Sequence, residues 1–194
     1  YETVEVVAGS GFDWLLLDME HSPNDVGSLT TQMLAAKGGT ASPIVRAPWN
    51  DMVMIKRILD VGAQTILVPY VQTADEAEKA VSYTRYPPEG LRGVASSTRA
   101  AGYGRVKDYL NRAANEICVL VQAETVKSLD NLEAICKVDG VTAAGNVMQV
   151  EEKCDNRRLV YGIIPIGNQA ALIRRDRVRP GAPRRSGPRH GRPP

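Results

Sequence analysis

Polar and charged side chains follow three short apolar runs in this chain, each long enough to form a buried strand. They are Asp18, Glu20 and His21 at and after the end of residues 13–18, Arg46 at the end of 43–46, and Gln122 and Glu124 at and just after the end of 117–122. Reactive groups of parallel α/β proteins gather where strands end, so one face could combine a histidine, an arginine, an amide and a carboxylate. That set suits the binding of a metal and an anionic substrate, followed by transfer of a proton.

Each of these residues also has a purely structural interpretation. A lone histidine at a strand end is often only a hydrogen-bonding group, and Arg46 could pair with a surface acid. Glu124 could stabilise a helix N-terminus, where acids are favoured, and Asp60 could be an exposed residue at a helix end. Spacing alone therefore leaves both interpretations open and names no reaction.

Apolar runs alternate with amphipathic segments over the first 140 or so residues. The pattern predicts strands at 13–18, 43–46, 65–69, 117–122 and, more weakly, 138–144, and helices at 24–37, 51–60, 74–84, 107–115 and 126–136. Asn50 is expected to cap the second helix, and Thr73 and Glu76 have the spacing of a capping box. This alternation is typical of a parallel sheet with crossover helices, either an open doubly wound sheet or a TIM-type barrel. No glycine fingerprint follows the first strand to favour a dinucleotide-binding version.

Composition limits the class of protein. The 194 residues include 43% hydrophobic and 24% charged side chains, which excludes a wholly disordered or fibrous chain. No run of about 20 apolar residues occurs, so we expect no membrane-spanning helix. The chain begins at Tyr1, not Met, without a basic and apolar leader, so we expect that a signal peptide is absent or was lost with the true start. Three cysteines without metal-type spacing favour a reducing, cytoplasmic setting. Cys118 lies in an apolar run and is expected to be a small core residue.

Charge divides the chain into unequal parts. Residues 174–194 hold eight Arg and one acid, Asp176, for a net charge of +7, and the remaining residues carry −5. We expect a partial barrel domain over 1–145, a divergent segment of uncertain structure over 146–173, and a disordered Pro/Gly/Arg-rich tail over 174–194. The tail could attract nucleic acid or an acidic membrane surface, but it has no aromatic residue for base stacking and no apolar helical face. We therefore expect neither partner.

Five longer motifs carry a resemblance to a known family. They are GFDWLLLDMEHSPND (11–25), VRAPWND (45–51), IKRILDVGAQTILVPYVQTADEAEKAV (55–81), RYPPEGLRGV (85–94) and VLVQAET (119–125). In order and spacing they resemble the HpcH/HpaI aldolases, class II pyruvate aldolases related to citrate lyase, over about residues 1–141. The resemblance implies an α/β fold of the (β/α)8 TIM-barrel type, incomplete in this chain, and a homo-oligomer that is commonly a hexamer.

The resemblance also implies a carbon–carbon lyase. Such an aldolase cleaves a 4-hydroxy-2-oxo acid to pyruvate and an aldehyde through a metal-bound enolate, with Mg2+ or Mn2+ as the cofactor. The implied roles are metal binding for Glu124, substrate binding for Gln122 and Arg46, acid–base chemistry for His21, and support of that histidine by Asp60. Asp60 ends a helix that precedes the third strand, so we expect its contact with His21 to cross a subunit boundary. Asp18 is the nearer carboxylate within one chain.

The motifs also depart from the family at both ends. The family has a strand and a helix before the first motif, and this chain opens within that helix. After residue 141 the family's second metal-binding aspartate would fall at Val150, with Glu151, Glu152 and Asp155 nearby. Two alternatives therefore stay open: an oxaloacetate decarboxylase or macrophomate-synthase-like enzyme with the same pocket, and a truncated, non-catalytic family member.

Overall fold

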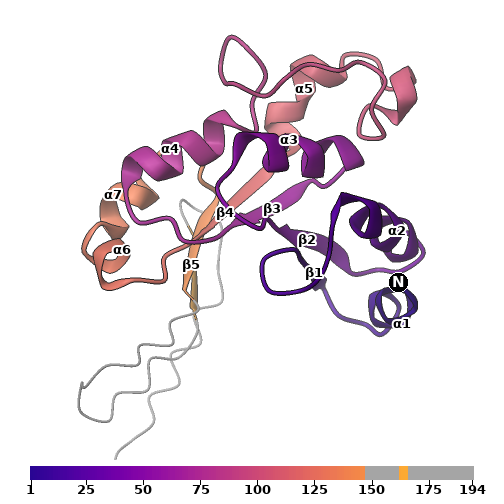
Figure 1. Ribbon diagram of the computed structural model, residues 1–194, viewed down its shortest axis with the longest axis horizontal. Coiled ribbons are helices and arrows are strands. Elements are labelled where there is room, and N and C mark those ends of the chain that lie inside the picture. The colour runs from indigo at the N-terminus through magenta and orange to yellow at the C-terminus, as the bar shows by residue number, and fades with distance from the viewer. Residues whose placement is uncertain (147–161, 166–194) are drawn as a thin grey trace, which may run out of the picture.

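A twisted sheet of six strands forms the centre of the protein (Figure 1). The structure, a computed structural model, describes residues 1–146 and 162–165. Its strands are β1 (Trp14–Asp18), β2 (Ser42–Arg46), β3 (Thr65–Val68), β4 (Cys118–Gln122), β5 (Ala143–Asn146) and β6 (Gly162–Pro165). They lie in the order of the sequence. The first five are parallel, and β6 runs antiparallel to β5.

The helices lie before β1 and in the connections between the parallel strands. They are α1 (Glu2–Ala8), α2 (Val26–Ala36), α3 (Met52–Val61), α4 (Ala74–Ser82), the 3-10 turn η1 (Gly102–Gly104), α5 (Tyr109–Glu116), α6 (Val126–Asp130) and α7 (Leu132–Cys136). The predicted alternation of strands and helices is confirmed. One predicted helix, over 126–136, is instead two short helices that meet at Asn131.

The strand order distinguishes the two folds that the sequence pattern left open. A doubly wound sheet reverses its strand order at a switch point, whereas β1 to β5 follow one another without reversal. Right-handed crossovers that always advance in one direction place the helices on one face, which is the arrangement of a barrel wall. Figure 1 shows α2, α3 and α4 following the curved sheet in this way.

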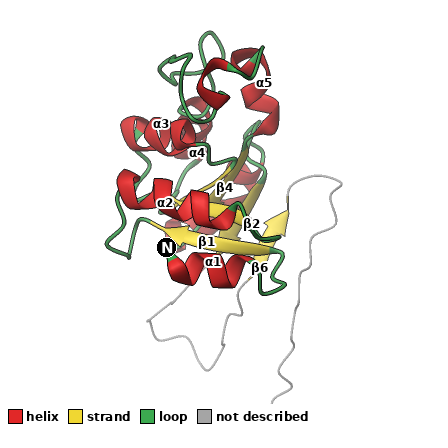
Figure 2. Cartoon of the chain, turned by 90° about the vertical axis from the view of Figure 1, so that its right-hand side faces the viewer, coloured by secondary structure: helices red, strands yellow, loops and turns green. Residues whose placement is uncertain are grey.

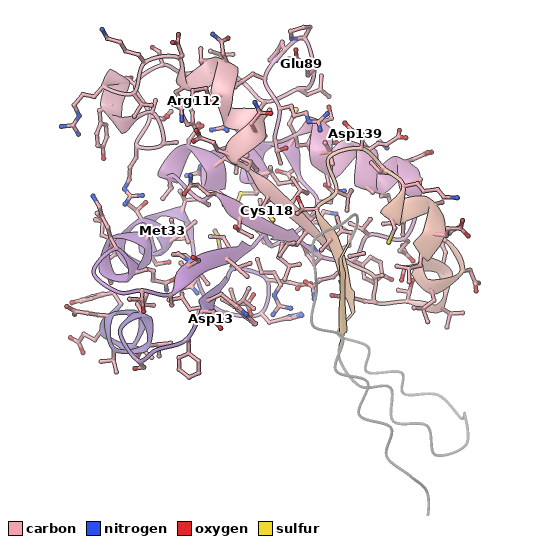
Figure 3. The ribbon with its side chains drawn as sticks, turned by 180° about the vertical axis from the view of Figure 1, so that it is seen from behind. Asp13, Met33, Glu89, Arg112, Cys118 and Asp139 are labelled. Atoms are coloured by element: carbon pink, nitrogen blue, oxygen red, sulfur yellow. The ribbon has the colours of Figure 1, made fainter. Side chains whose placement is uncertain are left out.

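The two faces of the strands differ in burial. The core lies between sheet and helices, and its fully buried side chains include Leu29, Val45, Ile55, Ile58, Leu59, Ile66, Val68 and Val121. The other face carries half-buried or exposed residues such as Leu16, Ile44 and Leu120. Cys118, predicted to be a small core residue, lies on this second face at the start of β4 and is half-buried (Figure 3). The short apolar runs thus bury one face, as a barrel strand does.

Two expected helix caps differ in detail from the structure. Asp51, not Asn50, caps α3, because its side chain accepts a hydrogen bond from the Met54 amide at 2.8 Å. Thr73 caps α4 as predicted, but the Glu76 carboxylate reaches one residue further back, to the Gln72 amide at 2.6 Å. The second half of a capping box is therefore replaced by a contact that fixes the loop after β3.

A long segment between α4 and α5 leaves the sheet. Residues 83–108 lie with α5 at one end of the molecule, away from α1 (Figures 1 and 2). Glu89 and Arg112 mark this end in Figure 3. One arginine of the segment, Arg92, is fully buried.

Several predictions concern residues outside the described part. The divergent segment 146–173, apart from residue 146 and strand β6, and the basic tail 174–194 lie there, as do Val150 and the acids near it. Within the described part, no helix is both long and apolar enough to cross a membrane.

Candidate active site

A doubly hydrogen-bonded ion pair joins the carboxyl ends of β1 and β2. Arg46 donates from Nε to Asp18 Oδ1 at 2.8 Å and from Nη2 to Asp18 Oδ2 at 2.6 Å. The two residues are direct partners in the strand register, so the sheet itself sets their distance. Parallel, paired contacts of this kind fix the plane of a guanidinium group.

Asp18 also organises the turn that follows β1. Its Oδ1 accepts from the backbone amides of Glu20 at 3.0 Å and His21 at 3.3 Å, and its carbonyl accepts from Asn24 Nδ2 at 2.6 Å. Burial raises the pKa of Asp18, but the hydrogen bonds from Arg46 and from the two amides outweigh burial and leave that pKa below its usual value. Asp18 is thus a fixed anion that positions both the turn and the arginine.

Glu20 brings a second carboxylate to Arg46. Its Oε2 lies 3.1 Å from Arg46 Nη1, and the side chain is 14% exposed. The same Oε2 lies 3.6 Å from His21 Nε2, although the His21 side chain is 72% exposed. Glu20 therefore links the buried arginine to a histidine that water and small molecules can reach.

Gln122 and Glu124 approach this group from β4. Burial raises the pKa of Glu124, the charge of Glu20 raises it further, and Arg46 and His21 oppose these effects only in part. Such mutual influence places Glu124 near all three residues. Gln122, at the end of β4, is 2% exposed, and its Oε1 has no hydrogen-bond partner among the described residues. A buried amide oxygen without a partner is costly, which marks it as a site where a ligand can bind.

Asp60 lies apart from the other predicted site residues. It is in the last turn of α3, at the amino end of β3, whereas His21 follows the carboxyl end of β1. Its Oδ1 accepts a hydrogen bond from Arg92 Nη2 at 2.8 Å. The structure therefore brings His21, Arg46 and Glu124 into one charged group, with Gln122 two residues before Glu124 at the end of β4, and leaves Asp60 at the amino ends of the strands. A contact between His21 and Asp60 across a subunit boundary stays a prediction.

The oxygen donors at these strand ends bear on the binding of a divalent cation. No group of three or more His, Cys, Asp or Glu side chains forms a ready metal site within residues 1–146 and 162–165. However, Glu124, the unpartnered Gln122 Oε1 and Glu20, whose Oε2 also faces Arg46, are all oxygen donors. Mg2+ prefers oxygen ligands and commonly uses one or two carboxylates together with water and substrate. The residues present fit such an ion.

Two contributors were not among the predicted site residues. Glu20 contacts Arg46 and shifts the pKa of Glu124, and Asp18 holds Arg46 in place. The alternation of Asp18 and Glu20 at the end of a strand was the only sequence signal for them. That signal does not show which arginine Asp18 and Glu20 contact, because the contact with Arg46 depends on the pairing of β1 with β2.

Comparison with known proteins agrees with this architecture, a barrel-type α/β wall whose strand ends carry a charged site. The family model described as HpcH/HpaI aldolase/citrate lyase matches residues 2–145. A 4-hydroxy-2-oxo-heptane-1,7-dioate aldolase of Salmonella arizonae is 54% identical over 140 residues, which are 72% of this chain and 53% of that protein. The chain belongs to the HpcH/HpaI aldolase/citrate lyase family, as its motifs predict.

Solved structures support the same fold. A family protein from Burkholderia cenocepacia J2315 is 40% identical with a TM-score of 0.72, over 74% of this chain and 58% of that one. Macrophomate synthase is 26% identical with a TM-score of 0.62, over 74% of this chain and 51% of that one. The prediction of a barrel-type α/β fold is confirmed. The chain spans about half the length of the curated relatives it matches.

Proposed function

We propose that the carboxyl ends of β1, β2 and β4 form the 2-oxo acid site of a metal-dependent class II aldolase. Such an enzyme cleaves a 4-hydroxy-2-oxo acid to pyruvate and an aldehyde. The observation that carries the proposal is the Arg46 guanidinium, held at a strand end by Asp18 and Glu20 beside Glu124. The relative that is named as an aldolase supports the same reaction.

Arg46 is proposed to bind the keto oxygen of the substrate. An arginine has five N–H donors, and three of its nitrogens already face carboxylate oxygens of Asp18 and Glu20. The second N–H of each Nη remains for a substrate oxygen. Negative charge grows on that oxygen as the enolate forms, and a cation that is already fixed in place stabilises this charge without reorganisation.

His21 is proposed to carry the proton, working through a water molecule. In the cleavage direction a base removes the proton of the 4-hydroxyl group, and the C3–C4 bond breaks with its electrons passing to the 2-oxo acid fragment. An acid then returns a proton to C3, which yields pyruvate and the aldehyde. The exposed His21 ring is accessible to both steps, and Glu20 lies close enough to orient it.

Glu124 and Gln122 are proposed to hold Mg2+ or Mn2+. A bound divalent cation would supply Lewis-acid polarisation of the 2-oxo acid's oxygens. The raised pKa of Glu124 and the unpartnered Gln122 Oε1 support this assignment, since both groups would gain from a positive charge nearby. Gln122 would also contact the substrate.

A homo-oligomer, hexameric as in the family, is proposed because Asp60 and His21 lie at opposite edges of one sheet. A second copy could bring its Asp60 to this His21. The proposed setting is the cytoplasm, with small molecules rather than nucleic acid or membrane as partners.

Oxaloacetate decarboxylation is the second candidate function. Loss of CO2 from oxaloacetate leaves the same pyruvate enolate, which Arg46 would stabilise in the same way. The likeness to macrophomate synthase favours this candidate. Release of CO2 from oxaloacetate, measured beside aldol cleavage, separates the two.

The direct test uses 4-hydroxy-2-oxoheptanedioate, the substrate named for the relative. Cleavage between C3 and C4 would give pyruvate and a four-carbon semialdehyde, and pyruvate is measured by coupling to lactate dehydrogenase. We expect release with Mg2+ or Mn2+ that stops with EDTA and in His21→Ala. A folded chain that releases pyruvate equally in His21→Ala would contradict the proposed site.

A further inference from the structure

An exposed aromatic pair lies at the same edge of the sheet as the charged group. The rings of Trp49 and Tyr70 are stacked, with centroids 5.5 Å apart and an angle of 28° between the planes. Trp49 is 53% exposed and Tyr70 is 41% exposed. Trp49 follows Arg46 by three residues, and Tyr70 follows the last residue of β3 by two. The pair therefore belongs to the loops after β2 and β3.

The backbone of Tyr70 is strained. Its φ of 56° lies in the left-handed region, which costs a residue with a side chain about 1 kcal/mol or more. The next residue holds this conformation, because the Val71 amide donates to the Gln122 carbonyl at 3.0 Å. Burial alone does not account for the strained position, since Tyr70 remains 41% exposed. Strain that the surrounding structure maintains is typical of ligand-contacting sites.

The position of β3 explains what this pair could contact. β3 lies between β2, which carries Arg46, and β4, which carries Gln122. Strands β1, β2 and β4 place charged or amide groups at the edge, whereas β3 leads into the loop that supplies the Tyr70 ring. A substrate whose 2-oxo acid end binds the charged residues would thus meet an aromatic surface beside them. Flat aromatic faces suit the carbon chain of a substrate rather than its carboxylate.

We propose that Trp49 and Tyr70 contact the carbon chain of the aldehyde half of the substrate and set the preferred length of that chain. This inference rests on the proposed aldolase function and adds the residues that determine specificity. The pair makes no contact with the transferred proton, so its loss should weaken aldehyde use and leave pyruvate enolisation unchanged.

The first test compares two half-reactions in Trp49→Ala. With straight-chain aldehydes from ethanal to hexanal, kcat/KM for aldol addition to pyruvate should rise about threefold per methylene in the unaltered chain, as partial burial of each CH2 predicts. In Trp49→Ala the rise should fall below about 1.5-fold per methylene. Deuterium exchange into the pyruvate methyl group should stay within about twofold, because a substitution outside the proton-transfer residues leaves that step intact.

Trp14→Ala is the matched control. Trp14 is also 53% exposed, but it begins β1 and therefore lies at the amino edge of the sheet. This variant should keep the full dependence on aldehyde length. An equal loss in both variants, or an unchanged dependence in Trp49→Ala, would overturn the proposal.

A second measurement does not need turnover. The chain has two tryptophans, so Trp14→Phe leaves Trp49 as the only indole. Saturable blue-shifted emission with 2-oxooctanoate, but not with pyruvate, would support the aromatic contact even if the aldolase assay failed. The absence of an emission shift with 2-oxooctanoate would overturn the proposed aromatic contact. A shift that depends only on protein concentration would also overturn it, because such a shift would show a contact between copies of the chain. If pyruvate shows no deuterium exchange but 2-oxooctanoate still shifts the emission, the proposed aldolase function is refuted and the aromatic contact is not.

Discussion

Two arginine–aspartate pairs at opposite edges of the sheet are built in different ways. Arg46 joins Asp18 through two hydrogen bonds, gains Glu20 as a further anion, and keeps part of its side chain accessible. Arg92 joins Asp60 through one hydrogen bond, is completely buried, and lies over the ring of Tyr86 with 4.5 Å between guanidinium carbon and ring centroid.

This difference indicates that the Arg46–Asp18 pair serves ligand binding, whereas the Arg92–Asp60 pair stabilises the fold. Arg46 lies near three carboxylates, those of Asp18, Glu20 and Glu124, and keeps one N–H of each Nη for a further oxygen. Arg92 has one carboxylate and aromatic faces, and it fastens the segment after α4 to the end of α3. It also places a cation beside an aspartate in the last helical turn, where negative charge is unfavourable. Arg92 should therefore matter most for stability, and Arg46 for chemistry.

Arg92→Met should produce the largest change in stability. Removing one member of a buried ion pair leaves the other charge uncompensated, which costs about 3–5 kcal/mol. The Asp60 side chain is 24% exposed and can regain some water in the variant. We therefore expect the free energy of unfolding in urea to fall by about 3 kcal/mol, the lower end of that range. Arg85→Met is the control, since the Asp139 side chain of its pair is 94% exposed, and it should cost less than about 1 kcal/mol. Equal losses of stability in Arg92→Met and Arg85→Met would refute the stabilising role of the Arg92–Asp60 pair.

Arg46→Met should have the opposite profile. Loss of a fixed donor to a developing oxyanion lowers rates by about 100-fold or more, so deuterium exchange into pyruvate should fall by that factor. Its cost in stability should be only about 1–2 kcal/mol, because Asp18 keeps its two backbone amide donors. Arg112→Met, which breaks only an exposed pair on α5, should alter neither quantity. Normal exchange in Arg46→Met would remove this arginine from the mechanism.

Glu124→Gln should change how stability depends on pH. The folded pKa of Glu124 is raised, so its contribution to stability is fully present below the unfolded pKa and is lost as pH rises through the folded pKa. With EDTA present, the variant should match the unaltered chain near pH 4 and become the more stable of the two toward pH 7. Urea titrations at both pH values measure this. A difference that does not change with pH would show that Glu124 is not in the charged group described above.

The smallest effect is expected from Tyr86→Phe. The Tyr86 hydroxyl is buried without a hydrogen-bond partner among the described residues, while its ring contacts Arg92. Removing only the hydroxyl should leave stability unchanged or raise it by less than about 1 kcal/mol. Tyr86→Leu removes the ring and should cost about 1 kcal/mol more than Tyr86→Phe. A lower stability of Tyr86→Leu than of Tyr86→Phe would show that the contact between the Tyr86 ring and Arg92 is stabilising.

Periodicity in the sequence predicted the strands, most helices and the four residues that gather at the strand ends. Short apolar runs have few ways to form a parallel sheet, and parallel strands must present their carboxyl ends together. Arg46 and Glu124 could therefore be placed near each other without coordinates.

Pairwise contacts were harder to predict. Nothing in the spacing shows that Arg92, within a Gly- and Pro-rich segment, returns to Asp60 through 32 residues of chain. The choice of Asp51 over Asn50 as a cap depends on a shift of one residue, and the left-handed Tyr70 depends on a hydrogen bond to β4. Such features follow from tertiary contacts, which a local pattern does not encode.

Deuterium exchange into the methyl group of pyruvate reports on the proposed 2-oxo acid site itself. It requires enolisation alone and no knowledge of the aldehyde, and NMR follows it with Mg2+ or Mn2+ and then with EDTA. We expect metal-dependent exchange that disappears in His21→Ala. A folded chain that shows no exchange with either metal would contradict the assignment of this strand edge as a 2-oxo acid site.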